Sequence, residues 1–269
     1  MDTLELPVYE RQPDDQLIYG YLSHADFTPH VPEPSRSASV YSRTELYERM
    51  TQLDVNFAGM RKDQVESTGI LRRLVPYVMV VRYVDDQLQF AIHQPNDAVA
   101  TPEFGYALGF SGEVDHYSVA GHLATDDTGV VYPLNVGSSY YSVLQASFRV
   151  LDGQAHVVLP RDNAKSFKTE VVPCGFISDY RPDEPGYFGN TRVGIITVMQ
   201  VDPSVSIELD EEHGVSLGWM SKDDVLLAAG QFDEWSKLCM PLLDRIDERA
   251  RLETGFAEVE DLPEHPAGE

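Results

Sequence analysis

The sequence has 269 residues and a mass of 30.1 kDa, which is enough for one large domain or two small ones. Its 44 Asp and Glu against 20 Lys and Arg give a formal charge of −24, which argues against direct binding to a nucleic-acid backbone or to anionic lipid. With 42% hydrophobic residues, the chain has enough apolar material for a core.

The first 54 residues predict an irregular N-terminal extension packed on the core. Residues 1–40 hold five prolines and only short apolar groups. Ser42-Arg43-Thr44-Glu45 has the pattern of a capping box, and the helix after it would run to about Leu53 and bury Leu46, Met50 and Leu53.

The clearest hairpin follows in the next segment. Residues 77–83 form a continuous run of β-forming residues, which is typical of a central strand. Asp85-Asp86-Gln87 predicts a turn, and residues 88–93 predict the returning strand. Residues 105–114 are rich in glycine and apolar residues, and residues 115–139 predict a long loop or insertion.

The second half mixes helices and strands. Helices are predicted at 142–151, from Ser221 to about Ala229, and at about 232–250, and strands at 155–159, 169–177, 192–201 and 205–209. The last helix would place Trp235, Leu238, Cys239, Leu242 and Ile246 on one face. The pattern therefore predicts an α+β or α/β domain over residues 55–251, followed by an acidic, disordered tail over residues 252–269.

A cytoplasmic protein is expected. No apolar run approaches the about 20 residues of a membrane span. The segment Met1-Asp2-Thr3-Leu4-Glu5 has no positive stretch followed by an apolar core, so no secretory signal is expected. Cys174 and Cys239 do not make a disulfide framework, and both are interpreted as small core residues.

The order of several short motifs resembles the Nudix superfamily. Leu74-Val75-Pro76-Tyr77-Val78 opens the central strand, Leu108-Gly109-Phe110-Ser111-Gly112-Glu113-Val114 follows the hairpin, and Trp235-Ser236-Lys237 lies in the closing helix. The sequence is most similar to a phosphoesterase-like branch of that superfamily. The resemblance implies a Nudix-like mixed sheet flanked by helices, with an N-terminal extension and an insertion.

The resemblance also implies where chemistry should lie. In the family, a glycine-containing loop leads into a helix whose glutamates hold Mg²⁺ against a diphosphate, because Mg²⁺ favours oxygen ligands. Here residues 142–151 contain no Asp or Glu, so no catalytic residue is carried over and no cofactor is expected. A rewired metal site would have to use Glu113, Asp115, His116 or His122, or the carboxylates after residue 207.

The acidity suggests a binding function instead. Our leading hypothesis is a non-enzymatic protein whose carboxylates occupy a basic, Arg/Lys-rich segment of a nucleic-acid-binding protein. The candidate partner-binding residues are Asp126, Asp127, Glu208, Asp210, Glu211, Glu212, Asp223, Asp224, Asp244, Asp247 and Glu248. An acidic composition of this kind is also typical of proteins adapted to high salt, and it can serve general solubility alone.

This profile is similar to that of the acidic degradosome-interacting proteins of giant Pseudomonas phages. That similarity implies a homodimer in the host cytoplasm that binds RNase E and inhibits RNA binding and turnover. The alternative is a Mg²⁺-dependent Nudix-type hydrolase of a nucleoside diphosphate derivative. A third hypothesis is a salt-adapted nucleotide-binding or regulatory Nudix relative.

Overall fold

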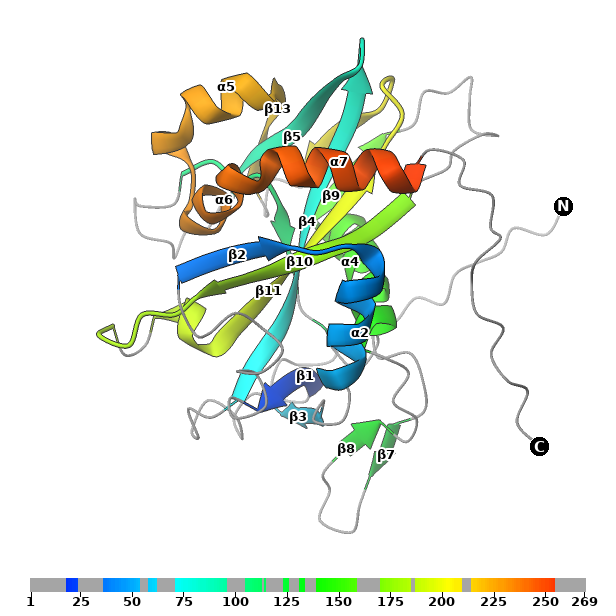
Figure 1. The fold of residues 1–269 in the computed structure, drawn as a ribbon, viewed down its shortest axis with the longest axis vertical. Helices are drawn as coiled ribbons and strands as arrows, with labels where there is room; N and C mark the ends of the chain where they lie inside the picture. The colour runs from blue at the N-terminus through cyan, green and yellow to red at the C-terminus, as the bar shows by residue number, and fades with distance from the viewer. Residues whose placement is uncertain are drawn as a thin grey trace, which may run out of the picture.

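The computed structural model describes residues 18–23, 36–53, 58–61, 71–95, 105–112, 114, 123–125, 131–133, 139–158, 170–184, 187–209 and 214–254. In this part of the chain, a mixed sheet separates two layers of helices (Figure 1). Helices α5 (Lys222–Leu227), α6 (Glu234–Cys239) and α7 (Leu243–Thr254) cover one face, and α4 (Ser139–Gln154) and α2 (Arg43–Leu53) cover the other. This architecture confirms the predicted α/β class.

The main sheet has the strand order β13-β5-β4-β11-β10-β2. The bounds of these strands are Gly214–Ser221 for β13, Gln87–Pro95 for β5, Leu71–Val84 for β4, Arg192–Gln200 for β11, Glu170–Asp179 for β10 and Arg36–Val40 for β2. Strands β4 and β11 run parallel, and the other neighbours in this order are antiparallel. The middle parts of β4 and β11 are mostly apolar because helices cover both of their faces.

The predicted hairpin of β4 and β5 is confirmed. Its turn residues Asp85 and Asp86 both adopt positive φ angles, 50° and 61°. Two successive left-handed residues define the tight hairpin turn whose twist matches that of the flanking strands. Aspartate tolerates this conformation better than most residues because its short polar side chain can form local hydrogen bonds.

Residues 36–53, which we assigned to the N-terminal extension, form part of the main sheet and its helical cover. Strand β2 pairs with the outer side of β10, and α2 follows it directly. The backbone N–H of Glu45 donates to Ser42 Oγ at 3.3 Å, which confirms the predicted cap. The side chains of Leu46 and Met50 are fully buried, and that of Leu53 lies outside the described residues.

The shorter elements lie around this framework. They are β1 (Ile18–Ser23), β3 (Ala58–Arg61), β6 (Phe110–Ser111), β7 (Leu123–Thr125), β8 (Val131–Pro133), β9 (Ala155–Val158) and β12 (Ser206–Leu209). Strands β1 and β3 extend the main sheet beside β4, whereas β9 pairs with β12 and β7 pairs with β8 in separate ribbons. The predicted loop 115–139 thus contains β7 and β8.

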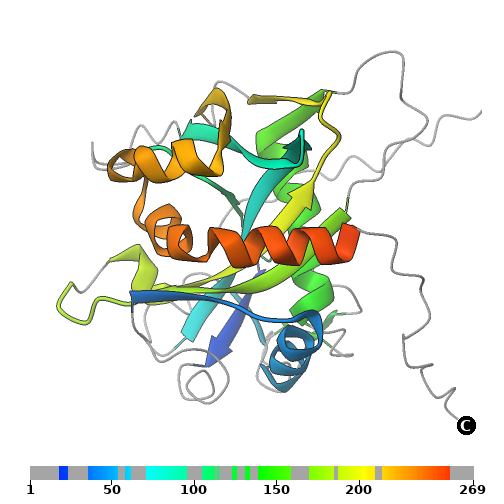
Figure 2. The ribbon, with the colours of Figure 1, turned by 45° about the horizontal axis from the view of Figure 1, so that its top comes forward.

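The closing helix is broken, so the prediction of one continuous helix over 232–250 is wrong. Helix α6 ends at Cys239, Met240–Leu242 form a 3₁₀ turn, and α7 begins at Leu243. Pro241 explains the break, because its ring cannot be accommodated in a helix interior. The change of direction at this point is visible in Figure 2.

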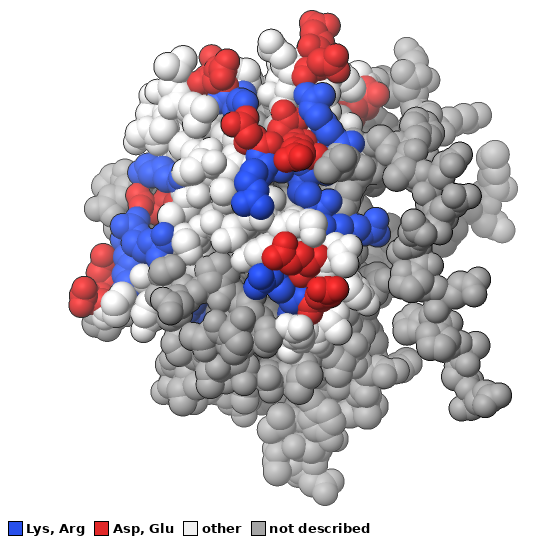
Figure 3. All heavy atoms as spheres, in the orientation of Figure 1, with Lys and Arg blue, Asp and Glu red and all other residues white. Residues whose placement is uncertain are grey.

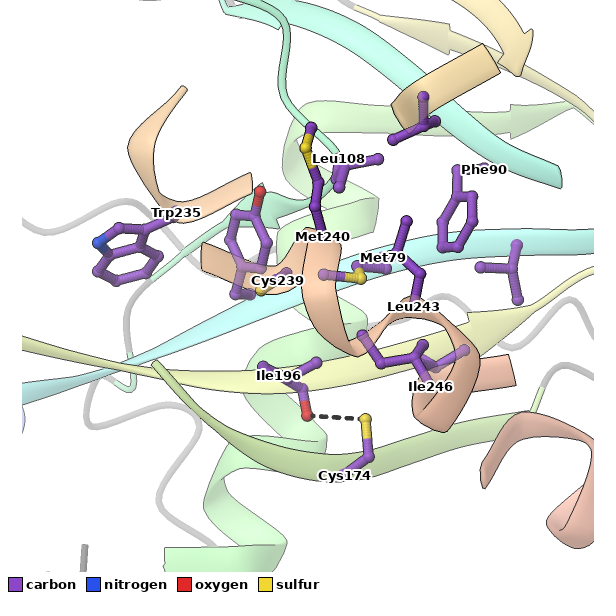
Figure 4. Close-up of a cluster of buried hydrophobic side chains, with 14 of the residues drawn as sticks. Met79, Phe90, Leu108, Cys174, Ile196, Trp235, Cys239, Met240, Leu243 and Ile246 are labelled. Carbon is purple, nitrogen blue, oxygen red and sulfur yellow. Dashed lines mark hydrogen bonds between the residues drawn. The ribbon is translucent and has the colours of Figure 1, made fainter. Parts of the chain in front are cut away.

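The predicted apolar face nevertheless covers the sheet. Trp235, Cys239 and Ile246 are buried, and Leu238 and Leu242 pack partly buried beside them. Figure 4 shows these helices above Met79, Phe90 and Ile196 of the sheet. Cys174 and Cys239 are fully buried, which confirms that both are core residues.

In the described part of the chain, the helices are too short or too polar to cross a membrane. Helix α7 continues to Thr254, so the first three residues of the predicted tail are helical, and residues 255–269 lie outside the described ranges. Strand β13 was not predicted. Val215, Leu217 and Trp219 do alternate with small residues in it, which is a pattern typical of a strand, and it pairs with the edge of β5.

Candidate functional site

The glycine loop, residues 105–112, lies between two strands that separate from each other. Strands β4 and β5 are paired only near their shared turn, between residues 81–84 and 87–90. Farther from the turn, Phe110 and Ser111 pair with β4, and Ala107 forms a bridge to His93 of β5. The backbone N–H of Gly112 donates to the carbonyl of Pro76 at 3.2 Å. The loop is therefore held on both sides by backbone hydrogen bonds.

On the α6 side, a buried group of polar atoms holds the loop. The hydroxyls of Tyr77 and Ser236 lie 2.8 Å apart, and the backbone N–H of Leu108 donates to Ser236 Oγ at 3.0 Å. The backbone N–H of Gly109 also donates to the Tyr77 hydroxyl. Because a Cβ on Gly109 would lie 2.7 Å from the Tyr77 ring, only glycine allows this approach.

Helix α6 presents Ser236 to the loop through its own N-terminal cap. Asp233 Oδ1 accepts the backbone N–H of Ser236 at 2.6 Å, and burial raises the pKa of Asp233. The next residue, Trp235, packs edge to face on Tyr77 with 5.6 Å between ring centroids. The three sequence motifs that carried the family resemblance thus meet at one place.

On the α4 side, the loop is held by apolar contacts. Gly112 lies so close to α4 that an added Cβ would lie 1.9 Å from Val150 Cγ2. The ring of Phe110 stacks on that of His93, with centroids 4.1 Å apart and 6° between the planes. Burial lowers the pKa of His93 to about 4, so the imidazole is neutral at pH 7.

Among the described side chains of helix α4, which follows the loop as the Nudix helix does in that family, none on the buried face is a carboxylate. Its buried side chains are Tyr140, Ser142, Val143, Ala146, Ser147 and Val150, and its exposed ones include Gln145, Phe148 and Arg149. The one acid of α4 in sequence is Asp152, whose side chain is not described. The described buried side chains of α4 thus offer two serine hydroxyls but no carboxylate, the anionic oxygen ligand by which proteins commonly hold Mg²⁺.

The described ranges contain no group of three or more His, Cys, Asp or Glu that could hold a metal ion. The residues that a rewired metal site would use first, Glu113, Asp115, His116 and His122, lie outside those ranges. Among the described residues there is therefore no candidate metal centre.

The candidate partner-binding acids are spread over several elements. Asp126, Asp127, Asp210, Glu211 and Glu212 lie outside the described residues. Glu208 lies on β12, on the α4 side of the sheet. Asp223 and Asp224 lie on α5, and Asp244, Asp247 and Glu248 lie on α7. The described members therefore fall on both sides of the sheet.

Several of these acids already have partners within the chain. Asp244 forms an ion pair with Lys222, and Asp247 accepts hydrogen bonds from Arg251 Nε at 2.8 Å and from the Tyr83 hydroxyl at 2.9 Å. Asp224 accepts from Ser221 Oγ at 2.6 Å at the start of α5. Asp223, Glu208 and Glu248 are exposed.

The charge of the described part is nearly balanced. It contains 15 Lys and Arg against 19 Asp and Glu, a balance of −4, whereas the whole sequence contains 20 against 44. Figure 3 shows positive and negative side chains intermixed on the face that it displays. Most of the −24 charge therefore belongs to segments outside the described ranges.

A further charged network was not anticipated from the sequence. The buried carboxylate of Asp179 on β10 accepts hydrogen bonds from Arg36 Nε at 3.1 Å and from Arg181 Nη2 at 3.2 Å, and the Tyr187 hydroxyl also donates to it. Arg36 and Arg181 both reach Glu234 on α6 as well. Arg36 and Glu234 are far in sequence from Asp179, and they join its network because β2 pairs with β10 and α6 packs on both strands.

His93 was also missed as a site residue, although a signal was present. Leu88, Phe90 and Ile92 alternate on the face of β5 under α5–α7, which places Ala91 and His93 on the other face. The alternation therefore could have predicted that His93 is buried on the face of β5 that meets the glycine loop.

Comparison with known proteins supports a Nudix-like fold. No family model matches the chain. The crystal structure of Tm1382, a putative Nudix hydrolase, covers 85% of this chain and 99% of its own, with a TM-score of 0.57 and 13% sequence identity. Protein YmaB of Bacillus subtilis (strain 168) is 21% identical over 211 residues, which cover 76% of this chain and 87% of YmaB. The chain is therefore a Nudix-like protein in its fold.

Proposed function

We propose that this protein is a non-enzymatic binding protein built on a Nudix-like scaffold. The observation that carries the proposal is helix α4, which follows the glycine loop in the chain and presents no carboxylate among its described buried side chains. The glycine loop is still held in place by Tyr77, Ser236 and Val150. A scaffold that keeps its loop while its helix lacks metal ligands supports a role in binding.

The partner that we propose is a basic, Arg/Lys-rich segment of a nucleic-acid-binding protein. The support is the distribution of charge, because 25 of the 44 acids and only 5 of the 20 basic residues lie outside the described ranges. Such acidic segments attract a cationic peptide, and the attraction weakens as salt screens it. RNase E as the partner, inhibition of RNA turnover and a homodimeric state are the finer parts of this proposal.

The proposal is tested by binding and activity measurements on the same preparation. The probes are a synthetic Arg-rich peptide and a nuclease-treated bacterial lysate, each washed at increasing salt. We expect capture of a basic nucleic-acid-binding protein that RNA displaces and high salt releases. With Mg²⁺ present, we expect no hydrolysis of nucleoside diphosphate derivatives. Metal-dependent turnover, or the absence of binding to both probes at low salt, would contradict the proposal.

The second candidate function is Mg²⁺-dependent hydrolysis of a nucleoside diphosphate derivative. The observation in its favour is the glycine loop, which runs between β4 and β5 and packs Gly112 against α4. In this case Glu113 and Asp115 would hold the metal. The changes Glu113→Gln and Asp115→Asn should then abolish turnover, whereas Glu48→Gln, an exposed change on α2, should leave it unchanged.

A further inference from the structure

Strand β13 is the last strand of the main sheet on one side. In the part of the chain that the structure describes, it pairs with β5 along one edge and with no strand along the other. Two of its apolar side chains are exposed, Val215 by 61% and Leu217 by 42%. An edge of this kind presents backbone groups that another extended chain can pair with.

Helix α5 adds to the apolar surface beside this edge. Leu226 is 45% exposed and Leu227 is 87% exposed. Among the described residues, four of the six large hydrophobic side chains that are exposed lie within residues 215–227. Such a concentration at one sheet edge marks an interaction surface more strongly than single exposed apolar residues do.

The charges around the edge have one prevailing sign. Residues 214–221 carry no charge. Asp223 and Asp224 follow directly on α5 and are exposed, and Glu208 is exposed on β12, which packs beside β13. The nearby cations are engaged within the chain, since Lys222 pairs with Asp244 and the Arg82 guanidinium lies on the Trp219 ring. An uncharged strand bordered by carboxylates complements an extended apolar segment that carries basic residues at its ends.

A β-bulge limits the length of β13 that can pair with another strand along its outer edge. The pairing of β13 with β5 shifts register between Ser216 and Gly218, and Gly218 has a φ angle of 90°. The outer edge is thus divided into two short runs, which disfavours long edge-to-edge pairing between copies. Two copies paired along β13 would also bring their carboxylates together, so the charge pattern favours a basic partner over a second copy.

We propose that the outer edge of β13 binds an extended segment with alternating apolar residues and flanking Arg or Lys, which adds to the sheet as a short strand. Its backbone would pair with β13, its apolar side chains would contact Val215, Leu217 and Leu227, and its basic ends would lie near Asp223 and Glu208. This inference rests on the proposed function, because it assigns a docking place to the basic partner segment.

The test uses a synthetic peptide of alternating Val and Thr with two Arg at each end, labelled with a fluorophore. A second peptide has the same side chains but is N-methylated at every backbone nitrogen of its Val and Thr residues, so neither of its edges can complete a β-ladder. An all-Arg peptide of equal charge is the third. Binding to the full chain is followed by fluorescence anisotropy at low and high salt.

Strand addition predicts that the first peptide binds at least about tenfold more tightly than the N-methylated one, which corresponds to about 1.4 kcal/mol. The double change Val215→Lys/Leu217→Lys should weaken its binding by about tenfold or more. The matched control is Tyr47→Lys/Phe148→Lys, which alters the two exposed aromatic residues of α2 and α4. Because all four side chains are exposed, folding should be retained, and circular dichroism checks this.

The outcomes separate this inference from the proposed function. If the three peptides bind equally and the β13 variant binds as the wild type does, the docking place is wrong while the basic partner remains supported. If no peptide of this set binds at low salt, the inference is wrong; if the lysate then also yields no basic nucleic-acid-binding protein, the proposed partner is wrong as well.

Discussion

The two faces of the sheet hold the same glycine loop by different means. Under α6, the loop is held by hydrogen bonds from the backbone of Leu108 and Gly109 to Ser236 and Tyr77. Under α4, it is held by close packing of Gly112 on Val150 and by the stacking of Phe110 on His93. Neither arrangement uses a metal ligand. The position of the loop is therefore a property of the packing of the described residues on both faces of the sheet.

The largest effect is expected on the α6 face. The change Trp235→Ala should lower the free energy of unfolding by about 3–5 kcal/mol, because it leaves a cavity beside Tyr77. Chemical denaturation measures this loss. Trp219→Ala on the other face is the control, and its loss should be smaller because Trp219 is only partly buried. Equal losses would contradict the greater importance of the α6 face.

Much of this framework could be predicted from the sequence. The hairpin of β4 and β5, the cap at Ser42 and the apolar face of α6 and α7 all follow from local patterns of apolar, turn and capping residues. The contact of Ser236 with Leu108 could not be predicted from such patterns, because two distant segments form it beside Tyr77. The break at Pro241 could have been predicted, since proline disrupts a helix interior.

The distribution of charge could not be predicted for a related reason. The sequence gives a formal charge of −24, but it does not say which acids are paired. The pairs of Asp244 with Lys222 and of Asp179 with Arg36 join residues of separate elements. The charge available for a partner can therefore be judged only from the folded arrangement.

On the α4 face, the contribution of His93 to the free energy of unfolding should depend on pH. The pKa of His93 is lowered from 6.5 to about 4 in the folded protein, so between these values the unfolded chain binds a proton that the folded chain does not. Stability should therefore fall as pH decreases through this window, by up to about 3 kcal/mol. Urea denaturation at stepped pH measures the slope.

The change His93→Phe provides the control for this slope, because phenylalanine can stack on Phe110 and does not titrate. The pKa of Asp233 is raised by burial and contributes a slope of the opposite sign, but both proteins retain it. The difference between wild type and variant therefore isolates His93. Parallel pH profiles for the two proteins would contradict the burial of a neutral imidazole.

The smallest effect, and the most specific one, concerns the polar contacts under α6. The change Ser236→Ala should cost about 1–3 kcal/mol, since it leaves the Leu108 N–H and the Tyr77 hydroxyl with one partner fewer in a buried place. Ser204→Ala, an exposed change, should stay within about 0.5 kcal/mol of wild type. Combining Ser236→Ala with Tyr77→Phe in a double-mutant cycle should reveal a coupling of about 0.5–1.5 kcal/mol, because the two hydroxyls lie 2.8 Å apart. Additive losses would mean that Ser236 acts through Leu108 alone, and that the loop is held by its backbone rather than by the joined hydroxyls.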